Sequence, residues 1–380
     1  MATALTEELI ILRDGAADFA RRFIAPRRDL QTMKGFPHDI WRSMADAGLL
    51  GMGISPDCGG MGGRFIDIFV AGEALARWGH NMGIVLSWVI HNAVSRYFIS
   101  EFGTDVQREG LLPLLAKGVK TASIAISEPG SMAHPRHMKT TATRRGGDYV
   151  INGHKSFLTN GQIADIFIVL TVTGSEGDKK RFTSFLIPKE TPGFAVTRNI
   201  SLGFLKPSPH CEIELANCAV PASNVLGKDG TAYEAMAKPF REIEEVCLMG
   251  PIIGGMQRQM ELLIDGIREG QTCPPTDELR GNLGALRYTV DTLRVIAFEA
   301  ASMLDSGKNY PEFPSLLLSF RAIANRFESL LRDLRAPSNR EDGDDLAVLT
   351  KDLIESINIA DHVAAIKTKK MGEELLKGKG

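Results

Sequence analysis

A block of short strand-like runs lies between two long helical zones, and this order constrains the fold more than any other feature. Apolar residues recur at helical spacing over residues 1–120 and again over residues 231–380. Between them, over residues 121–230, runs such as DIFIVLTV and FTSFLIP are separated by Gly, Pro, Asn and Asp turns. Because strands and helices do not alternate, the pattern argues against a doubly wound nucleotide-binding sheet. We predict an α+β fold with an N-terminal helical domain, a middle antiparallel, barrel-like β domain and a C-terminal helical bundle, divided as above.

The composition is that of a globular protein whose partners are small molecules and other proteins. Hydrophobic residues make up 44% of the 380 residues, charged residues make up 24%, and the formal net charge is −2. Such a balance gives no electrostatic signature for nucleic acid or an anionic membrane, and no apolar run approaches the roughly twenty residues that span a bilayer. The five cysteines form no CxxC pair and the eight histidines show no metal spacing. We therefore expect a cytoplasmic protein without a metal site.

Two segments in the middle zone have the chemistry of a cofactor edge. Residues 124–130 read IAISEPG and residues 151–161 read INGHKSFLTNG, with a polar turn at residues 145–148 between them. Strand-like runs that end in hydroxyl-bearing loops can present hydrogen-bond donors along one edge of a planar cofactor, an arrangement that suits a flavin. The alternative is plain turn chemistry, since Ser and Thr satisfy loop backbone groups in many proteins.

Several motifs together resemble the acyl-CoA dehydrogenase family of flavoproteins over about the first 260 residues. They are the segment GLLGMGISPDCGGMGG, the ISEPG and FLTNG loops and the β-domain exit VPASNVLGKDG. The resemblance implies an oxidoreductase acting on CH–CH bonds, which oxidises an acyl thioester of CoA or of an acyl carrier protein to the 2-enoyl thioester. FAD would accept the hydride, and an electron-transfer flavoprotein would then accept the electrons. The resemblance places Ile126 and Ser127 along the pyrimidine edge of the flavin, Phe157 near its xylene and central rings, and Thr159 near N5.

Such an enzyme also needs a carboxylate base that faces the flavin across the substrate. In the family the base most often lies near the C-terminus, where this chain reads NIADHV, with Ala360 about where the glutamate belongs. A minority branch that includes isovaleryl-CoA dehydrogenase carries its glutamate on the first long helix of the C-terminal domain. Glu244 is in register with that position. Asp361, one residue from the more common place, is the alternative.

The helical pattern gives an independent reason to favour Glu244. It follows Phe240 by four residues and precedes Cys247 by three, so it is predicted to lie on an apolar stripe that also includes Tyr233, Met236, Ala237 and Ile243. A carboxylate on such a stripe is costly to desolvate, which predicts a raised pKa and a functional role. A carboxylate at the rim of the stripe is the alternative. Glu242 and Glu245 fall on the polar face with Lys238 and Arg241, where charges are usually solvated.

The FAD contacts that the family takes from its C-terminal domain are replaced in this chain. The glycine-rich loop reads RAPSNREDGDD, the arm that reaches a neighbouring subunit reads REGQTCPPTDELRGNLG, and the usual EPGAGSD reads EPGSMAHPRH. Three assemblies therefore stay open. The first is a homodimer or homotetramer in which Arg136, His137 or Arg340 meets the pyrophosphate. The second is a hetero-oligomer with a related chain that completes the FAD site, and the third is an FAD-deficient, thioester-binding or structural subunit.

Overall fold

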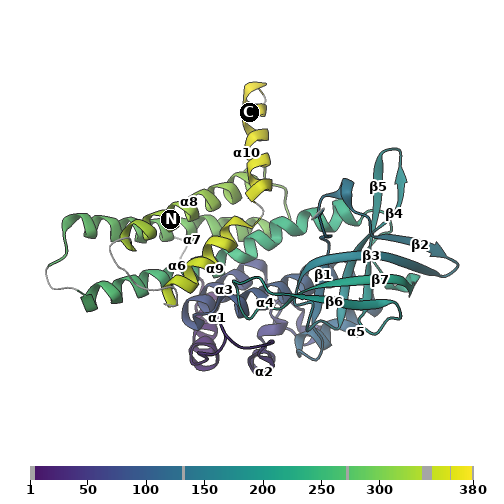
Figure 1. Ribbon diagram of the computed structural model, residues 1–380, viewed down its shortest axis with the longest axis horizontal. Coiled ribbons are helices and arrows are strands. Elements are labelled where there is room, and N and C mark those ends of the chain that lie inside the picture. The colour runs from purple at the N-terminus through teal and green to yellow at the C-terminus, as the bar shows by residue number, and fades with distance from the viewer. Residues whose placement is uncertain (1–4, 131–132, 271–273, 336–344, 360, 379–380) are drawn as a thin grey trace. The chain divides into compact units, whose positions relative to one another are not determined.

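The computed structural model describes residues 5–130, 133–270, 274–335, 345–359 and 361–378. Helices come first, strands follow and helices end the chain, which confirms the predicted α+β class (Figure 1). The helices are α1 (Glu7–Phe19), α2 (His38–Asp46), α3 (Phe65–Gly79), α4 (Met82–Ala93), α5 (Asp105–Ala116), α6 (Lys238–Gly270), α7 (Asp277–Ser306), α8 (Phe313–Arg335), α9 (Asp345–Asn358) and α10 (Asp361–Leu376). Within the described residues, three π-helical segments, Ala20–Ile24, Val94–Ser100 and Tyr233–Ala237, adjoin α1, α4 and α6.

The strands of the described residues form one eight-stranded sheet, in which β2, β3 and β7 run side by side (Figure 1). The order is β6-β7-β3-β2-β4-β5-β8, and β1 pairs with β4. Most pairs are antiparallel as predicted, but β1 and β2 each pair with β4 in parallel, so the sheet is mixed. The strands are β1 (Ala122–Ala125), β2 (Thr141–Arg145), β3 (Asp148–Thr159), β4 (Ile166–Glu176), β5 (Lys179–Pro188), β6 (Phe194–Ile200), β7 (His210–Pro221) and β8 (Val225–Leu226).

The apolar core of the sheet explains its register. Alternate residues of β3 are buried, with Tyr149 and Ile151 in the core and Asp148 and Asn152 exposed. These side chains pack with Phe167 of β4 and other buried residues of β5 and β7. Each large apolar side chain that is fully buried contributes about 1.5–3 kcal/mol, so a one-residue slip of β3 would expose this set and is strongly disfavoured.

The chain divides into two compact units. The first comprises Met1–Ala25, Phe65–Met82 and Glu245–Gly380, and the second comprises Pro26–Arg64 and Gly83–Glu244. All the strands, Glu244 and the four residues predicted to contact a flavin lie in the second unit.

Close helix packing in the first unit depends on glycines of α6. A Cβ atom on Gly250 would lie 2.1 Å from the carbonyl oxygen of Phe69, and one on Gly254 would lie 2.1 Å from that of Glu73. Both carbonyls belong to α3. Only glycine permits two helix backbones to approach this closely. Among the described residues, no helix has the length and hydropathy needed to cross a bilayer.

Candidate functional site

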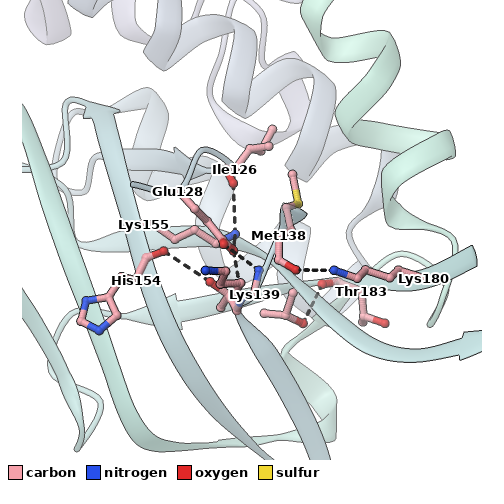
Figure 2. A network of polar contacts seen from close by, with 10 residues as sticks. Ile126, Glu128, Met138, Lys139, His154, Lys155, Lys180 and Thr183 are labelled. Carbon is pink, nitrogen blue, oxygen red and sulfur yellow. Dashed lines mark hydrogen bonds and ion pairs between the residues drawn. The ribbon is translucent and has the colours of Figure 1, made fainter. Parts of the chain in front are cut away.

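The loop that follows β1 is anchored to β3 by a buried lysine. Lys155 Nζ donates hydrogen bonds to Glu128 Oε1 and to the carbonyl oxygen of Ile126, both at 3.0 Å. Figure 2 shows both contacts converging on the end of the Lys155 side chain. Because Ile126 and Glu128 flank Ser127 in sequence, the backbone on both sides of Ser127 is held against β3.

Both oxygens of the Glu128 carboxylate accept hydrogen bonds at this anchor. It also accepts hydrogen bonds from the backbone N–H groups of Lys139 at 2.7 Å and Thr140 at 2.9 Å. Desolvation raises the pKa of Glu128, but the charge of Lys155 and the hydrogen bonds from Thr140 and Lys139 outweigh it, so the pKa lies below its usual value. Burial lowers the pKa of Lys155 to about 8 against the attraction of Glu128. Both residues are thus charged at neutral pH, and each needs the other.

A β-bulge turns Phe157 out of the sheet. In β3, Ser156 and Phe157 together lie opposite a single residue of β7, Glu212, since the register shifts at this point. Phe157 has φ 59° and is 49% exposed, although it is a large apolar residue. The N–H of Ser156 donates to the carbonyl oxygen of Ser127 at 3.0 Å. Bulges commonly re-aim a side chain at functional sites, and this one fixes an exposed aromatic ring beside the anchored loop.

Thr159 forms a cross-strand pair with a buried histidine. It is the last residue of β3 and lies opposite His210, the first residue of β7. Thr159 Oγ1 lies 3.1 Å from His210 Nε2, and His210 Nδ1 lies 3.1 Å from the carbonyl oxygen of Ser208. Burial lowers the pKa of His210 against the hydrogen bond to Ser208, which favours the neutral ring. The hydroxyl of Ser123 in β1 donates to the carbonyl oxygen of Thr159 at 2.7 Å, so the end of β3 is also tied to β1.

Glu244 lies near the start of α6, and this part of the helix is fixed within the second unit. The ring of Phe240 packs on Phe98 with 4.7 Å between centroids. Arg241 Nη2 donates to the carbonyl oxygen of Ala133 at 2.8 Å, which links the helix to the segment that follows the ISEPG loop. Glu244 itself is half-buried. The predicted apolar stripe is buried at Met236, Ala237, Phe240, Ile243 and Cys247 and partly buried at Tyr233.

Glu245 differs from its prediction as a solvated residue. Its Oε1 lies 3.2 Å from Nη2 of Arg321 in α8, whose side chain is only 14% exposed. The helical pattern of α6 alone cannot show a charge that a neighbouring helix supplies, and this is why the prediction was wrong. Arg321 also donates to Asp361 Oδ1 at 3.1 Å, so the alternative base is already ion-paired. Ala360 lies outside the described residues.

Two of the three predicted pyrophosphate contacts lie on one exposed turn. Arg136 and His137 belong to the 3₁₀ turn Pro135–His137, and both are exposed. Lys180 Nζ donates to the carbonyl oxygens of Arg136 and Met138, each at 2.8 Å, and so fixes this turn to β5. Figure 2 shows the contact with Met138. Arg340 lies outside the described residues.

Three residues that shape this site were not identified from the sequence. Lys155 shares the inward face of β3 with Tyr149 and Ile151, and a lysine on an inward face indicates a buried anionic partner. This lysine could therefore have been identified from the sequence. The sequence around Glu128, ISEPG, indicated only a turn. His210 gave no local signal, because its partner Thr159 is 51 residues away in sequence.

Two sequence profiles of one family match this chain. The profile of "Acyl-CoA dehydrogenase, N-terminal domain" matches residues 6–119, and that of "Acyl-CoA dehydrogenase, middle domain" matches residues 123–218. Together they cover more than half of the chain.

Known relatives extend the similarity beyond these two domains. An acyl-CoA dehydrogenase of Bacillus subtilis is 27% identical over 325 residues, which cover 84% of this chain and 85% of the relative. The mitochondrial isovaleryl-CoA dehydrogenase of Oryza sativa subsp. japonica is 29% identical over 303 residues, which cover 78% and 73% of the two chains.

A solved structure of an acyl-CoA dehydrogenase has a similar fold. Butyryl-CoA dehydrogenase from Megasphaera elsdenii superposes with a TM-score of 0.88 at 21% identity, covering 99% of this chain and 100% of that one. The profiles, the relatives and the fold agree. The chain belongs to the acyl-CoA dehydrogenase family, whose members are flavin-dependent oxidoreductases that act on CH–CH bonds.

Proposed function

We propose that this chain uses FAD to dehydrogenate an acyl-CoA thioester to the 2-enoyl-CoA, with Glu244 as the base that removes the α-proton. The observation that carries the proposal is the shared anchoring of the predicted flavin contacts. Lys155 fixes the backbone around Ser127 to β3, and the bulge beside it presents Phe157. The anchor and the bulge thus hold a hydrogen-bonding loop and an exposed aromatic ring in fixed positions, as a bound planar cofactor requires.

The residues present fit the isoalloxazine ring of FAD. Phe157 offers an aromatic face that is 49% exposed, in a left-handed conformation that costs free energy for a non-glycine residue. Within the described residues the Ser127 hydroxyl has no protein hydrogen-bond partner, so it can donate to a ligand. A stacking ring with one hydroxyl on the loop after β1 and another at the end of β3 is the set that a planar, hydrogen-bonding cofactor requires.

When bound, FAD supplies the acceptor for the hydride that leaves Cβ while the Cα–Cβ double bond forms. Glu244 takes the α-proton onto its carboxylate, which is half-buried and therefore partly shielded from water. The link from Arg241 to Ala133 ties its helix to the segment after the ISEPG loop, and so holds the base in the same unit as the flavin contacts. Asp361 is the weaker candidate, because its side chain is 57% exposed and is therefore less shielded from water than the half-buried Glu244.

The proposal includes the partners that this chemistry needs. An electron-transfer flavoprotein would reoxidise the bound FAD, and an oligomer would complete the FAD site. Because the usual C-terminal FAD contacts are replaced, the partner subunit is either a second copy of this chain or a related chain. A carrier-protein thioester is the alternative substrate.

The visible absorption spectrum of the purified protein tests flavin binding. The chain is prepared alone and co-expressed with a related chain, and oxidised-flavin bands in either preparation support the proposal. We expect Phe157→Ala to weaken FAD binding by about tenfold through lost stacking. Tyr288→Ala serves as the matched control, since Tyr288 is a 57% exposed aromatic residue on α7. Flavin in neither preparation would contradict the proposal and favour an FAD-deficient, thioester-binding subunit.

A further inference from the structure

The hydrogen bond between Thr159 and His210 has a fixed direction. A carbonyl oxygen only accepts, so the 3.1 Å contact of His210 Nδ1 with the Ser208 carbonyl places the ring proton on Nδ1. Nε2 of the neutral ring then has only a lone pair, and the Thr159 hydroxyl donates to it over 3.1 Å. A flipped ring would put carbon atoms at both contacts and lose both hydrogen bonds.

The surrounding backbone holds this geometry in place. The side chain of Gln162 donates to the carbonyl oxygen of His210 at 2.7 Å, and the N–H of Asn160 donates to the carbonyl oxygen of Pro209 at 2.8 Å. His210 is 5% exposed, so water does not compete for its ring. Thr159 is therefore held between His210 on one side and the partly exposed surface of the site on the other.

The direction of this bond decides what Thr159 can offer a ligand. With its proton committed to His210, the hydroxyl presents only oxygen lone pairs, so the ligand atom that meets it must be a donor. The flavin N5 atom is an acceptor in oxidised FAD and carries a hydrogen in two-electron-reduced FAD. A threonine hydroxyl free to rotate could serve both forms, but this one matches the reduced form.

We propose that His210 is a positioning residue that holds the Thr159 hydroxyl as an acceptor, so that the site binds reduced FAD more tightly than oxidised FAD. The proposal rests on the proposed function and on the family resemblance, which places Thr159 near flavin N5. His210 is not a catalytic residue in this account, because it acts only through Thr159. Its effect is on the midpoint potential of the bound flavin.

The test compares midpoint potentials of the flavin-loaded protein, prepared with its partner chain if that chain is needed for flavin. His210→Phe removes the acceptor while filling the space, and Thr159→Val removes the hydroxyl. We expect His210→Phe to lower the ratio of reduced-form to oxidised-form affinity by about tenfold, which is ~30 mV for a two-electron couple. The same change in the Thr159→Val background should have no further effect. His210→Gln, which retains an acceptor, should largely restore the potential, and His154→Phe controls for an exposed histidine on β3.

A second readout needs no flavin. Nitrogen chemical shifts of histidine-labelled protein report the tautomer of His210, and the proposal requires the proton on Nδ1. A proton on Nε2, or equal potential shifts from His210→Phe with and without Thr159, would overturn the role of His210 while leaving the proposed function intact. A protein that binds no flavin under any condition would overturn both.

Discussion

Lys155 Nζ and Glu128 Oε1 lie 3.0 Å apart, and their side chains are 0% and 5% exposed. Removing one partner leaves the other charge buried without compensation, which costs about 3–5 kcal/mol in comparable pairs. We predict that Lys155→Met and Glu128→Gln each lower the free energy of unfolding by this order, and that the double variant loses less than the sum. Urea unfolding of all four proteins measures the coupling.

An exposed ion pair on the same sheet provides the control for this cycle. Arg198 and Glu212 pair across β6 and β7, but the Arg198 side chain is 64% exposed. Arg198→Met should cost no more than about 1 kcal/mol. Additive effects of Lys155→Met and Glu128→Gln would contradict the account of the loop anchor.

Glu244→Gln is expected to abolish most of the dehydrogenase activity while leaving the flavin spectrum unchanged. The amide keeps the size of the side chain but cannot take the α-proton, and loss of a positioned base typically costs about 10²–10⁴-fold in rate. Stopped-flow reduction of the bound flavin by acyl-CoA measures this step directly.

Two further variants assign that loss to one carboxylate. Glu242→Gln makes the same change two residues earlier on α6 and should leave flavin reduction unaffected. Asp361→Asn tests the alternative base. A Glu244→Gln protein that retains the rate, with an Asp361→Asn protein that loses it, would move the base to α10.

Glu328 in α8 should make the protein less stable as pH rises. Desolvation raises its pKa to about 7 despite a hydrogen bond from Gln259, so the folded chain binds a proton that the unfolded chain releases near pH 4.5. The folded state is thus favoured below pH 4.5 and loses that advantage up to about pH 7. Glu328→Gln should remove this part of the pH dependence and stabilise the protein at pH 8 by about 1–3 kcal/mol. An unchanged slope of unfolding free energy against pH between these values would contradict the prediction.

His91 should act in the opposite direction. Burial lowers its pKa to about 4, against the hydrogen bond of its ring with the backbone carbonyl of Leu115, so the unfolded chain binds a proton near pH 6.5 that the folded chain does not. Stability should fall as pH drops from about 6.5 to 4, by roughly 3 kcal/mol at most. Thermal unfolding of His91→Gln across this range should show a shallower dependence than the native protein. If both proteins show the same pH dependence, the loss of stability at low pH comes from groups other than His91.

The sequence predicted the features that are set by local patterns. The polar turn at residues 145–148 joins β2 to β3, with Gly146 at φ 61°, and the ISEPG loop follows β1. The predicted FLTNG loop instead lies partly within a strand, because β3 continues to Thr159. The burial of Phe240 and Ile243 also followed from helical spacing.

Features made by residues far apart in the chain were not predictable in the same way. The parallel pairing of β1 with β4 joins Ala122 to Ile166, with a hairpin between them in sequence. The Glu245–Arg321 ion pair depends on how α6 and α8 pack, which no single helix pattern contains. The roles of Ile126, Ser127, Phe157, Thr159 and Glu244, the division into three domains and the cytoplasmic location stay predictions.

Anaerobic addition of acyl-CoA to the flavin-loaded protein tests the central claim most directly. The account predicts that the oxidised-flavin bands bleach and that the 2-enoyl-CoA appears in an amount equal to the flavin reduced. Bleaching by a carrier-protein thioester alone would correct the substrate class. A bound flavin that no acyl thioester reduces would contradict the account.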